Sequence, residues 1–265
     1  MELSGRTTLI TGGGRGIGAA LARRFHSAGA TVVVADLAGA KDVAADLDGA
    51  IGLTADVSTQ AGNVAMIEEA REAVGPIDLF FANAGIAGGT LLEDTDEATW
   101  ERTFAINIHA HRWAAAALLP EWLERRDGYF CSTASAAGLL VQIGSAPYTL
   151  TKRAAVAFAE WMSVTYGDRG VKVSCLCPQG VRTAMLEAAT DGPSGADVVK
   201  AAGEVLEPEQ VADVVADAIA DERFLILPHP EVQKYLELKT SQPDRWLAGM
   251  RRLQSTILGP RSTSE

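Results

Sequence analysis

Positive charge is scarce in this sequence of 265 residues, which carries 23 lysine and arginine residues against 34 aspartate and glutamate residues. The resulting net charge of −11 makes a surface that repels phosphate backbones and anionic lipid headgroups. We therefore expect neither a nucleic acid partner nor a membrane partner for this protein.

Long apolar runs and cysteine are also scarce. No run reaches the length needed to cross a bilayer, and the first residues, MELSGRTTLI, lack the apolar core of a signal peptide. Only Cys131, Cys175 and Cys177 carry thiols, an odd number without the spacing of a disulfide framework. Such cysteine usage fits a reducing compartment, so the sequence predicts a cytoplasmic protein.

A metal-binding cluster is missing too. Cys175 and Cys177 lie in the apolar run VKVSCLCP, where we expect two strand residues that face opposite sides of a sheet. His109 and His111 stand two apart in a segment of helical periodicity, so they point to different faces. With no further ligands at suitable spacing, no metal site is predicted.

What the sequence does contain is a regular alternation of short β-branched runs with segments of helical periodicity. Strands are expected at residues 7–11, 31–36, 77–83, 128–133, 171–177 and 223–228, with one more ending near residue 56. Helices are expected at residues 16–27, 41–47, 59–74, 96–126, 147–167 and 208–221. This pattern predicts the α/β class: a single domain with a doubly wound seven-stranded parallel sheet, the Rossmann fold.

A glycine-rich segment, TGGGRGIG at residues 11–18, joins the first predicted strand to the first helix. Glycine permits a tight turn with positive φ and lets the backbone approach a pyrophosphate, which the N–H groups of the helix terminus attract. A purely structural turn is the alternative. The context of strand, turn and helix favours dinucleotide binding by Gly12, Arg15, Gly16, Ile17 and Gly18.

Two aspartates end the second and third predicted strands. Asp36 can accept hydrogen bonds from the adenosine ribose hydroxyls and would repel a 2′-phosphate, which favours NAD over NADP. Arg15 is a counter-signal, because a guanidinium can contact a phosphate. Asp56 is either a contact to the adenine edge or a cap of its strand, and both alternatives stay open.

The segment PYTLTK places Tyr148 and Lys152 four residues apart at the start of a helix, on one face. A phenol with a pKa of about 10 is a poor base at neutral pH. A nearby ammonium and the helix N-terminus can supply the roughly 4 kcal/mol that would bring this pKa to near neutrality. We therefore predict that Tyr148 transfers a proton, the alternative being an exposed Tyr–Lys pair.

These motifs resemble the short-chain dehydrogenase/reductase family, in its branch of roughly 250 residues. The resemblance covers residues 3–228: TGGGRGIG is similar to T-G-x-x-x-G-x-G, the Asn-Ala-Gly at residues 83–85 to the segment after the fourth strand, and YTLTK to Y-x-x-x-K. Ser135, thirteen residues before Tyr148, matches the family's catalytic serine, and Asn107 matches its asparagine.

The resemblance implies a role for each of these residues. Tyr148 would exchange a proton with the substrate oxygen, and Ser135 would hydrogen-bond that oxygen. Lys152 would bind the nicotinamide ribose and lower the pKa of Tyr148, and Asn107 would hold a water that links Lys152 to solvent. The implied cofactor contacts are completed by Val57, Asn83, Ala84, Gly85, Pro178, Val181 and Thr183, besides Tyr148 and Lys152 themselves.

The sequence departs from the family after the sixth strand, where PQGVRT replaces P-G-x-V-x-T. Gln179 stands at the first glycine, which leaves the local backbone shape open. The resemblance implies that residues 184–206 close over the substrate, and the Gly-Pro-Ser-Gly at residues 192–195 suggests mobility there. Gln179, Met185 and Leu186 are the predicted substrate pocket, which is mostly apolar.

The single domain is expected to have two parts: residues 1–228 as the dinucleotide-binding catalytic part and residues 229–265 as a C-terminal helical extension. Pro243 suits the start of a helix whose apolar stripe consists of Trp246, Met250, Leu253 and Ile257. This helix could pack on its own subunit, contact another subunit or cover the pocket. The protein is expected to be a homodimer or homotetramer.

The predicted function is an oxidoreductase that transfers a hydride between NAD(H) and a hydrophobic secondary alcohol or ketone. One alternative is an NADPH-linked acyl-thioester or carbonyl reductase, against which Asp36 and the acidic surface argue. Another is a non-catalytic nucleotide-sensing protein, against which the presence of all four catalytic positions argues.

Overall fold

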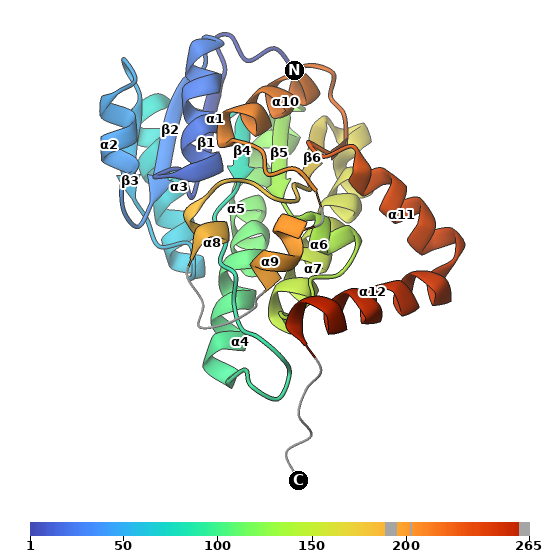
Figure 1. Ribbon diagram of the computed structural model, residues 1–265. Coiled ribbons are helices and arrows are strands. Elements are labelled where there is room, and N and C mark those ends of the chain that lie inside the picture. The colour runs from blue at the N-terminus through green and yellow to red at the C-terminus, as the bar shows by residue number, and fades with distance from the viewer. Residues whose placement is uncertain (189–194, 202, 260–265) are drawn as a thin grey trace.

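One parallel sheet of seven strands organises the computed structural model, which describes residues 1–188, 195–201 and 203–259 (Figure 1). The strand order is β3-β2-β1-β4-β5-β6-β7, so the chain moves outward from β1 in one direction and then from β4 in the other. This reversal leaves a crevice at the carboxyl ends of β1 and β4, where ligands bind in such sheets. The strands are β1 (Thr7–Thr11), β2 (Thr31–Asp36), β3 (Ile51–Thr54), β4 (Leu79–Ala82), β5 (Gly128–Thr133), β6 (Val171–Leu176) and β7 (Leu225–Ile226).

Helices cover both faces of the sheet, as the doubly wound prediction requires. One core cluster forms beneath α1 (Gly16–Ser27), α2 (Ala40–Ala45) and α10 (Pro208–Ala220). The other forms beneath α3 (Gln60–Val74), α5 (Ala110–Arg125) and α7 (Ala146–Tyr166). Every residue of β4 and β5 is buried, because strands covered on both faces have no solvent side. The predicted fold class is confirmed.

Two predicted elements differ from the structure. The single helix expected at residues 96–126 is α4 (Glu97–Phe104) followed by a π-helical turn, η1 (Ala105–His109), and then α5. The π turn carries Asn107, and such turns often mark functional sites. The last strand is shorter than expected, because only Cys175 and Leu176 of the neighbouring strand pair with it.

The prediction for the two neighbouring cysteines was wrong. The Sγ atoms of Cys175 and Cys177 lie 3.8 Å apart, and both residues are buried in the same core cluster. The reason is elementary, because side chains two apart along an extended chain point to the same face.

The C-terminal extension consists of α11 (Glu231–Ser241), which the sequence analysis missed, and the predicted α12 (Pro243–Leu258) (Figure 1). Trp246 is buried, and the ammonium of Lys239 lies 5.2 Å from its ring centroid. Lys239 also donates to the carbonyl oxygens of Leu139 and Leu140 at 2.5 and 2.9 Å. The extension therefore packs on its own subunit, beside the turn after Ser135. No helix in the described ranges has both the length and the apolarity to cross a membrane.

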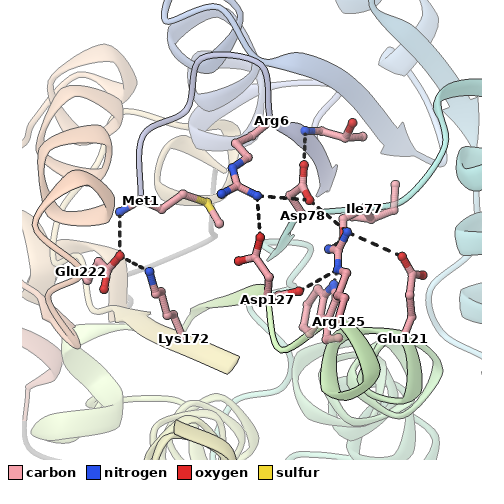
Figure 2. Close-up of polar contacts among 11 residues, drawn as sticks. Met1, Arg6, Ile77, Asp78, Glu121, Arg125, Asp127, Lys172 and Glu222 are labelled. Carbon is pink, nitrogen blue, oxygen red and sulfur yellow. Dashed lines mark hydrogen bonds and ion pairs between the residues drawn. The ribbon is translucent and has the colours of Figure 1, made fainter. Parts of the chain in front are cut away.

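Charged side chains tie the amino ends of the strands together, on the side opposite the crevice (Figure 2). Asp78 accepts a hydrogen bond from the Thr7 N–H at 2.9 Å and pairs with Arg125 at 3.1 Å and Arg6 at 3.6 Å. Arg6 in turn bonds Asp127 at 2.7 Å. These contacts join β1, β4 and the loop before β5. We therefore expect them to stabilise the fold and to take no part in ligand binding at the crevice.

Asp78→Asn should therefore destabilise the protein without impairing turnover. The Asp78 side chain is 15% exposed, and its loss would leave two guanidinium groups without their shared carboxylate. We expect a loss of about 2 kcal/mol in the free energy of unfolding, measured by urea titration. Asp213→Asn is the control, because its pair with Arg24 is exposed and should contribute less than about 1 kcal/mol. Equal losses in the two variants would contradict this prediction.

Candidate active site

The glycine-rich turn has the shape of a phosphate cradle. Gly12 and Gly16 adopt positive φ values of 63° and 54°. A methyl group at Gly14 would lie 2.0 Å from the Ala38 carbonyl oxygen, and one at Gly18 would lie 2.2 Å from that of Gly12. No side chain caps the N-terminus of α1, and its first turn holds no acidic residue. The residues present thus fit a dinucleotide, whose phosphates would meet free N–H groups.

Asn83 supports this turn from the end of β4. Its Nδ2 atom donates to the carbonyl oxygens of Thr11 and Gly12 at 3.0 and 3.1 Å. Its Oδ1 atom accepts from the Thr133 hydroxyl at 3.2 Å. The side chain is therefore engaged with protein atoms, and it fixes the turn against β4 and β5.

The two strand-end aspartates have different surroundings. Asp36 accepts the Gly14 N–H at 3.0 Å, so its carboxylate borders the glycine-rich turn. Asp56 accepts the Ser58 N–H at 2.9 Å, which makes it a cap of the loop after β3. The next residue, Val57, accepts the Asn63 amide through its carbonyl oxygen at 2.8 Å. Of the two alternatives for Asp56, the structure supplies contacts for the cap.

The side chains of Ser135, Tyr148 and Lys152 meet beside the carboxyl end of β5. Ser135 begins α6 (Ala136–Leu139) and accepts the Ala137 N–H at 3.1 Å, and its side chain is near enough to the Tyr148 hydroxyl to lower the pKa of Tyr148. The Lys152 ammonium lies 5.7 Å from the centroid of the Tyr148 ring and donates to the Thr133 carbonyl at 2.8 Å. The predicted juxtaposition of serine, phenol and amine is present.

Asn107 borders the same group from η1. A methyl group at Gly85 would lie 3.3 Å from the Lys152 amine and 3.4 Å from the Asn107 Oδ1 atom. The Asn107 amide donates to Ile86 O at 2.9 Å and to the Thr151 hydroxyl at 3.1 Å, while Oδ1 accepts the Ile86 N–H at 2.9 Å. Asn107 thus holds the loop after Gly85 onto α7, and its predicted water stays a prediction.

Burial sets the protonation of this cluster. It raises the pKa of Tyr148, although the nearby Ser135 side chain acts in the opposite direction. It lowers the pKa of Lys152 to about 8, although the Cys175 and Cys177 thiols oppose this change. In the protein alone, burial is therefore the largest influence on the pKa of each of these two side chains. The lowering of the Tyr148 pKa by Lys152 beside a bound cofactor, which the family resemblance implies, stays a prediction.

The clasp, as we call residues 178–183, closes the other side of the crevice. Arg182 N–H donates to Leu206 O, and Leu206 N–H donates to Gly180 O, both at 2.9 Å. A methyl group at Gly16 would lie 3.1 Å from the Thr183 methyl, so the clasp reaches the glycine-rich turn. The only described non-glycine residues with positive φ are Arg126 and Glu222, so Gln179 needs no glycine-like backbone.

The three predicted pocket residues are described, whereas residues 189–194 and 202 of the predicted closing segment lie outside the described residues. Met185 and Leu186 lie on α8 (Ala184–Glu187), directly after the clasp, and Met185 is 43% exposed. Residues 192–194, where we expected mobility, lie outside the described residues. Sequence reasoning missed His229, which hydrogen-bonds the clasp; its signal was the segment LPHPEV in place of a glycine-rich end.

Comparison with known families matches residues 6–194 to the short chain dehydrogenase model. The chain belongs to the short chain dehydrogenase family. It is therefore an oxidoreductase of the kind that acts on CH–OH groups and binds a nicotinamide cofactor.

Named relatives of this dehydrogenase extend over nearly its whole length. It is 32% identical to 17-beta-hydroxysteroid dehydrogenase 13 of Rattus norvegicus, over 96% of this chain and 85% of the relative. It is 34% identical to 1-deoxy-11-beta-hydroxypentalenate dehydrogenase of Streptomyces arenae, over 93% of this chain and 89% of the relative.

Solved structures of the family are also similar to this dehydrogenase. A short chain dehydrogenase/reductase from Burkholderia phymatum in complex with NAD is 27% identical, with a TM-score of 0.83 over 92% of this chain and 96% of that one. A 3-ketoacyl-(acyl-carrier-protein) reductase from Brucella melitensis complexed with NADH is 25% identical, with a TM-score of 0.77 over 86% and 98%.

Proposed function

We propose that this dehydrogenase transfers a hydride between NAD(H) and a hydrophobic secondary alcohol or ketone. The observation that carries the proposal is the grouping of three side chains: the Lys152 amine lies 5.7 Å from the centroid of the Tyr148 ring, and Ser135 is near enough to lower the pKa of Tyr148. The hydroxysteroid and hydroxypentalenate named for two relatives support an apolar alcohol as the substrate class.

Each side chain then has a chemical task. Ser135 orients the substrate oxygen by a hydrogen bond, and Tyr148 gives a proton to that oxygen in reduction or takes it in oxidation. Lys152 holds positive charge beside the phenol and binds the ribose. A nicotinamide held in the crevice would supply the hydride chemistry.

We further propose that residues 184–206 close over the substrate, next to a pocket formed by Gln179, Met185 and Leu186. Residues 1–228 form the catalytic part and residues 229–265 the extension. Support comes from Met185, whose side chain is 43% exposed directly beyond the clasp and is thus free to cover an apolar ligand.

A test of this function is an oxidation screen of secondary alcohols, from small aliphatic ones to steroids, followed by the formation of NADH. We expect turnover to rise with the apolar surface of the alcohol. Binding of NADH without turnover of any alcohol or ketone would favour the nucleotide-sensing alternative. Turnover confined to 3-ketoacyl thioesters would favour the acyl-thioester alternative, which the reductase from Brucella melitensis keeps open.

Asp36 is proposed to select NAD over NADP. Asp36→Ala should weaken NAD binding about 10- to 100-fold, because hydrogen bonds to a carboxylate contribute about 1.5–3 kcal/mol, and should improve NADP binding. Tryptophan fluorescence titration with NADH and NADPH measures both. Asp56→Ala removes a carboxylate from the neighbouring strand end and should leave the ratio unchanged. An unchanged ratio in Asp36→Ala would contradict the proposal.

A homodimer or homotetramer is proposed as well. Leu150, Trp161 and Val164 are 50%, 53% and 87% exposed along α7, an apolar stripe that a second copy could cover. A monomeric mass in light scattering would contradict this state.

A cytoplasmic location is proposed from the three cysteines, all of them buried and unpaired.

A further inference from the structure

His229 lies between β7 and α11, and it is 2% exposed. Both of its ring nitrogens contact the backbone of the clasp. Nδ1 lies 3.2 Å from the Gln179 nitrogen, and Nε2 lies 2.9 Å from the Gly180 oxygen. One buried side chain thus contacts two consecutive residues of the segment that borders the crevice.

These contacts determine where the imidazole carries its proton. A backbone N–H can only donate, so Nδ1 must present its lone pair to Gln179. A carbonyl can only accept, so Nε2 must carry the hydrogen that Gly180 receives. Only the neutral tautomer protonated at Nε2 satisfies both neighbours.

The His229 imidazole takes the place of a backbone acceptor at the end of the pairing between β6 and β7. The N–H groups of Cys175 and Cys177 donate to the carbonyls of Phe224 and Ile226 at 2.6 and 2.9 Å. The next N–H on this edge of β6 is that of Gln179. At this point the segment after β7 turns away toward α11, and no carbonyl of the described residues accepts this N–H. His229 supplies an acceptor at this position, so the edge of β6 stays paired up to the clasp.

The clasp in turn contacts Ser135, the residue proposed to orient the substrate oxygen. The carbonyl of Pro178 accepts the Ser135 hydroxyl at 3.4 Å and the Ala136 N–H at 2.8 Å. A shift of Gln179 or Gly180 would therefore move the residue that orients Ser135. We propose that His229 is a positioning residue, whose neutral imidazole fixes the backbone of Gln179 and Gly180 and thereby the place of Ser135 and of the Gln179 side chain at the substrate.

Graded substitutions can test this inference, which rests on the proposed function for its kinetic readout. His229→Phe keeps the ring volume and removes both contacts. His229→Asn retains an oxygen that can accept from Gln179, and His229→Gln retains an N–H that can reach Gly180. Tyr129→Phe is the matched control, because it deletes a buried hydrogen bond of 2.6 Å from β5 to Ser174 on β6 and removes no contact of the clasp itself.

We expect His229→Phe to lower kcat/KM for ketones about 10- to 100-fold, because small misplacements of reacting groups are costly. His229→Asn or His229→Gln should recover part of this loss. Tyr129→Phe should lower the melting temperature and leave kcat/KM unchanged. A His229→Phe enzyme that unfolds at a lower temperature but has wild-type kinetics would overturn the proposal. Equal losses of kcat/KM in the three His229 variants would overturn it as well.

A second readout does not depend on turnover. Nitrogen NMR of the full chain should show His229 protonated at Nε2, and hydrogen exchange of the Gln179 amide should be slow in the wild type and fast in His229→Phe. A proton on Nδ1 would overturn the proposal. If the wild type turned over no substrate but gave the expected NMR result, the proposed function would fail and the role of His229 in fixing the clasp would stand.

Discussion

Tyr148→Phe is expected to lower kcat about 100- to 10,000-fold while NADH still binds. The substitution removes a single oxygen, the phenol oxygen that lies near Ser135, and general acid–base catalysis by one residue contributes a factor of this size. Because the ring remains, its contact with the Lys152 amine and the local packing are retained. Steady-state kinetics measures the loss of kcat, and a fluorescence titration measures the binding of NADH.

Tyr166→Phe is the control for this experiment. Tyr166 ends the same helix, where its ring contacts Trp161 at 5.6 Å between centroids. It should keep wild-type kcat and KM. A Tyr148→Phe enzyme with more than about a tenth of wild-type turnover would show that another group transfers the proton.

Lys152→Met is expected to lose turnover about 100-fold or more and yet to be more stable than the wild type when no cofactor is bound. Lys152 is 3% exposed, and burial lowers its pKa to about 8, so the native fold holds its ammonium against a desolvation cost. The pKa difference from the ordinary value corresponds to about 3 kcal/mol, from which the lost bond to Thr133 takes about 1. We expect a gain of about 2 kcal/mol at pH 7.

The pH dependence of this gain has a definite sign. Between pH 8 and pH 10.5 the native protein releases the Lys152 proton while the unfolded chain still holds it. The unfolded state then binds more protons, so wild-type stability rises with pH. The advantage of Lys152→Met should therefore shrink across this interval. Urea titrations at several pH values between 7 and 10.5 measure it.

Lys234→Met is the matched control for this comparison. Lys234 is exposed on α11, so its substitution should change the free energy of unfolding by less than about 0.5 kcal/mol and leave turnover intact. A Lys152→Met protein that is less stable than the wild type at pH 7 would show that the amine stabilises the fold. The idea that this residue serves catalysis at the expense of stability would then be wrong.

Features that depend on neighbours in the chain could be predicted. The glycine-rich turn, the strand periodicities and the pairing of Tyr148 with Lys152 all involve residues within one or two turns of each other. Features that join distant segments could not. The contact of Ser135 with Pro178 spans 43 residues, and that of His229 with Gln179 spans 50. The length of β7 likewise depends on how far its neighbour β6 runs beside it.

The chain's own order of residues determined the sheet, the crevice at the strand ends and the pairing of Tyr148 with Lys152, because periodicity and turn chemistry are local. The family resemblance added Ser135 and Asn107 to this pair. Only the packed molecule decided the π turn at Asn107, the lowered pKa of Lys152 and the partners of His229. Desolvation depends on which segments surround a group, and a sequence does not list its neighbours in space.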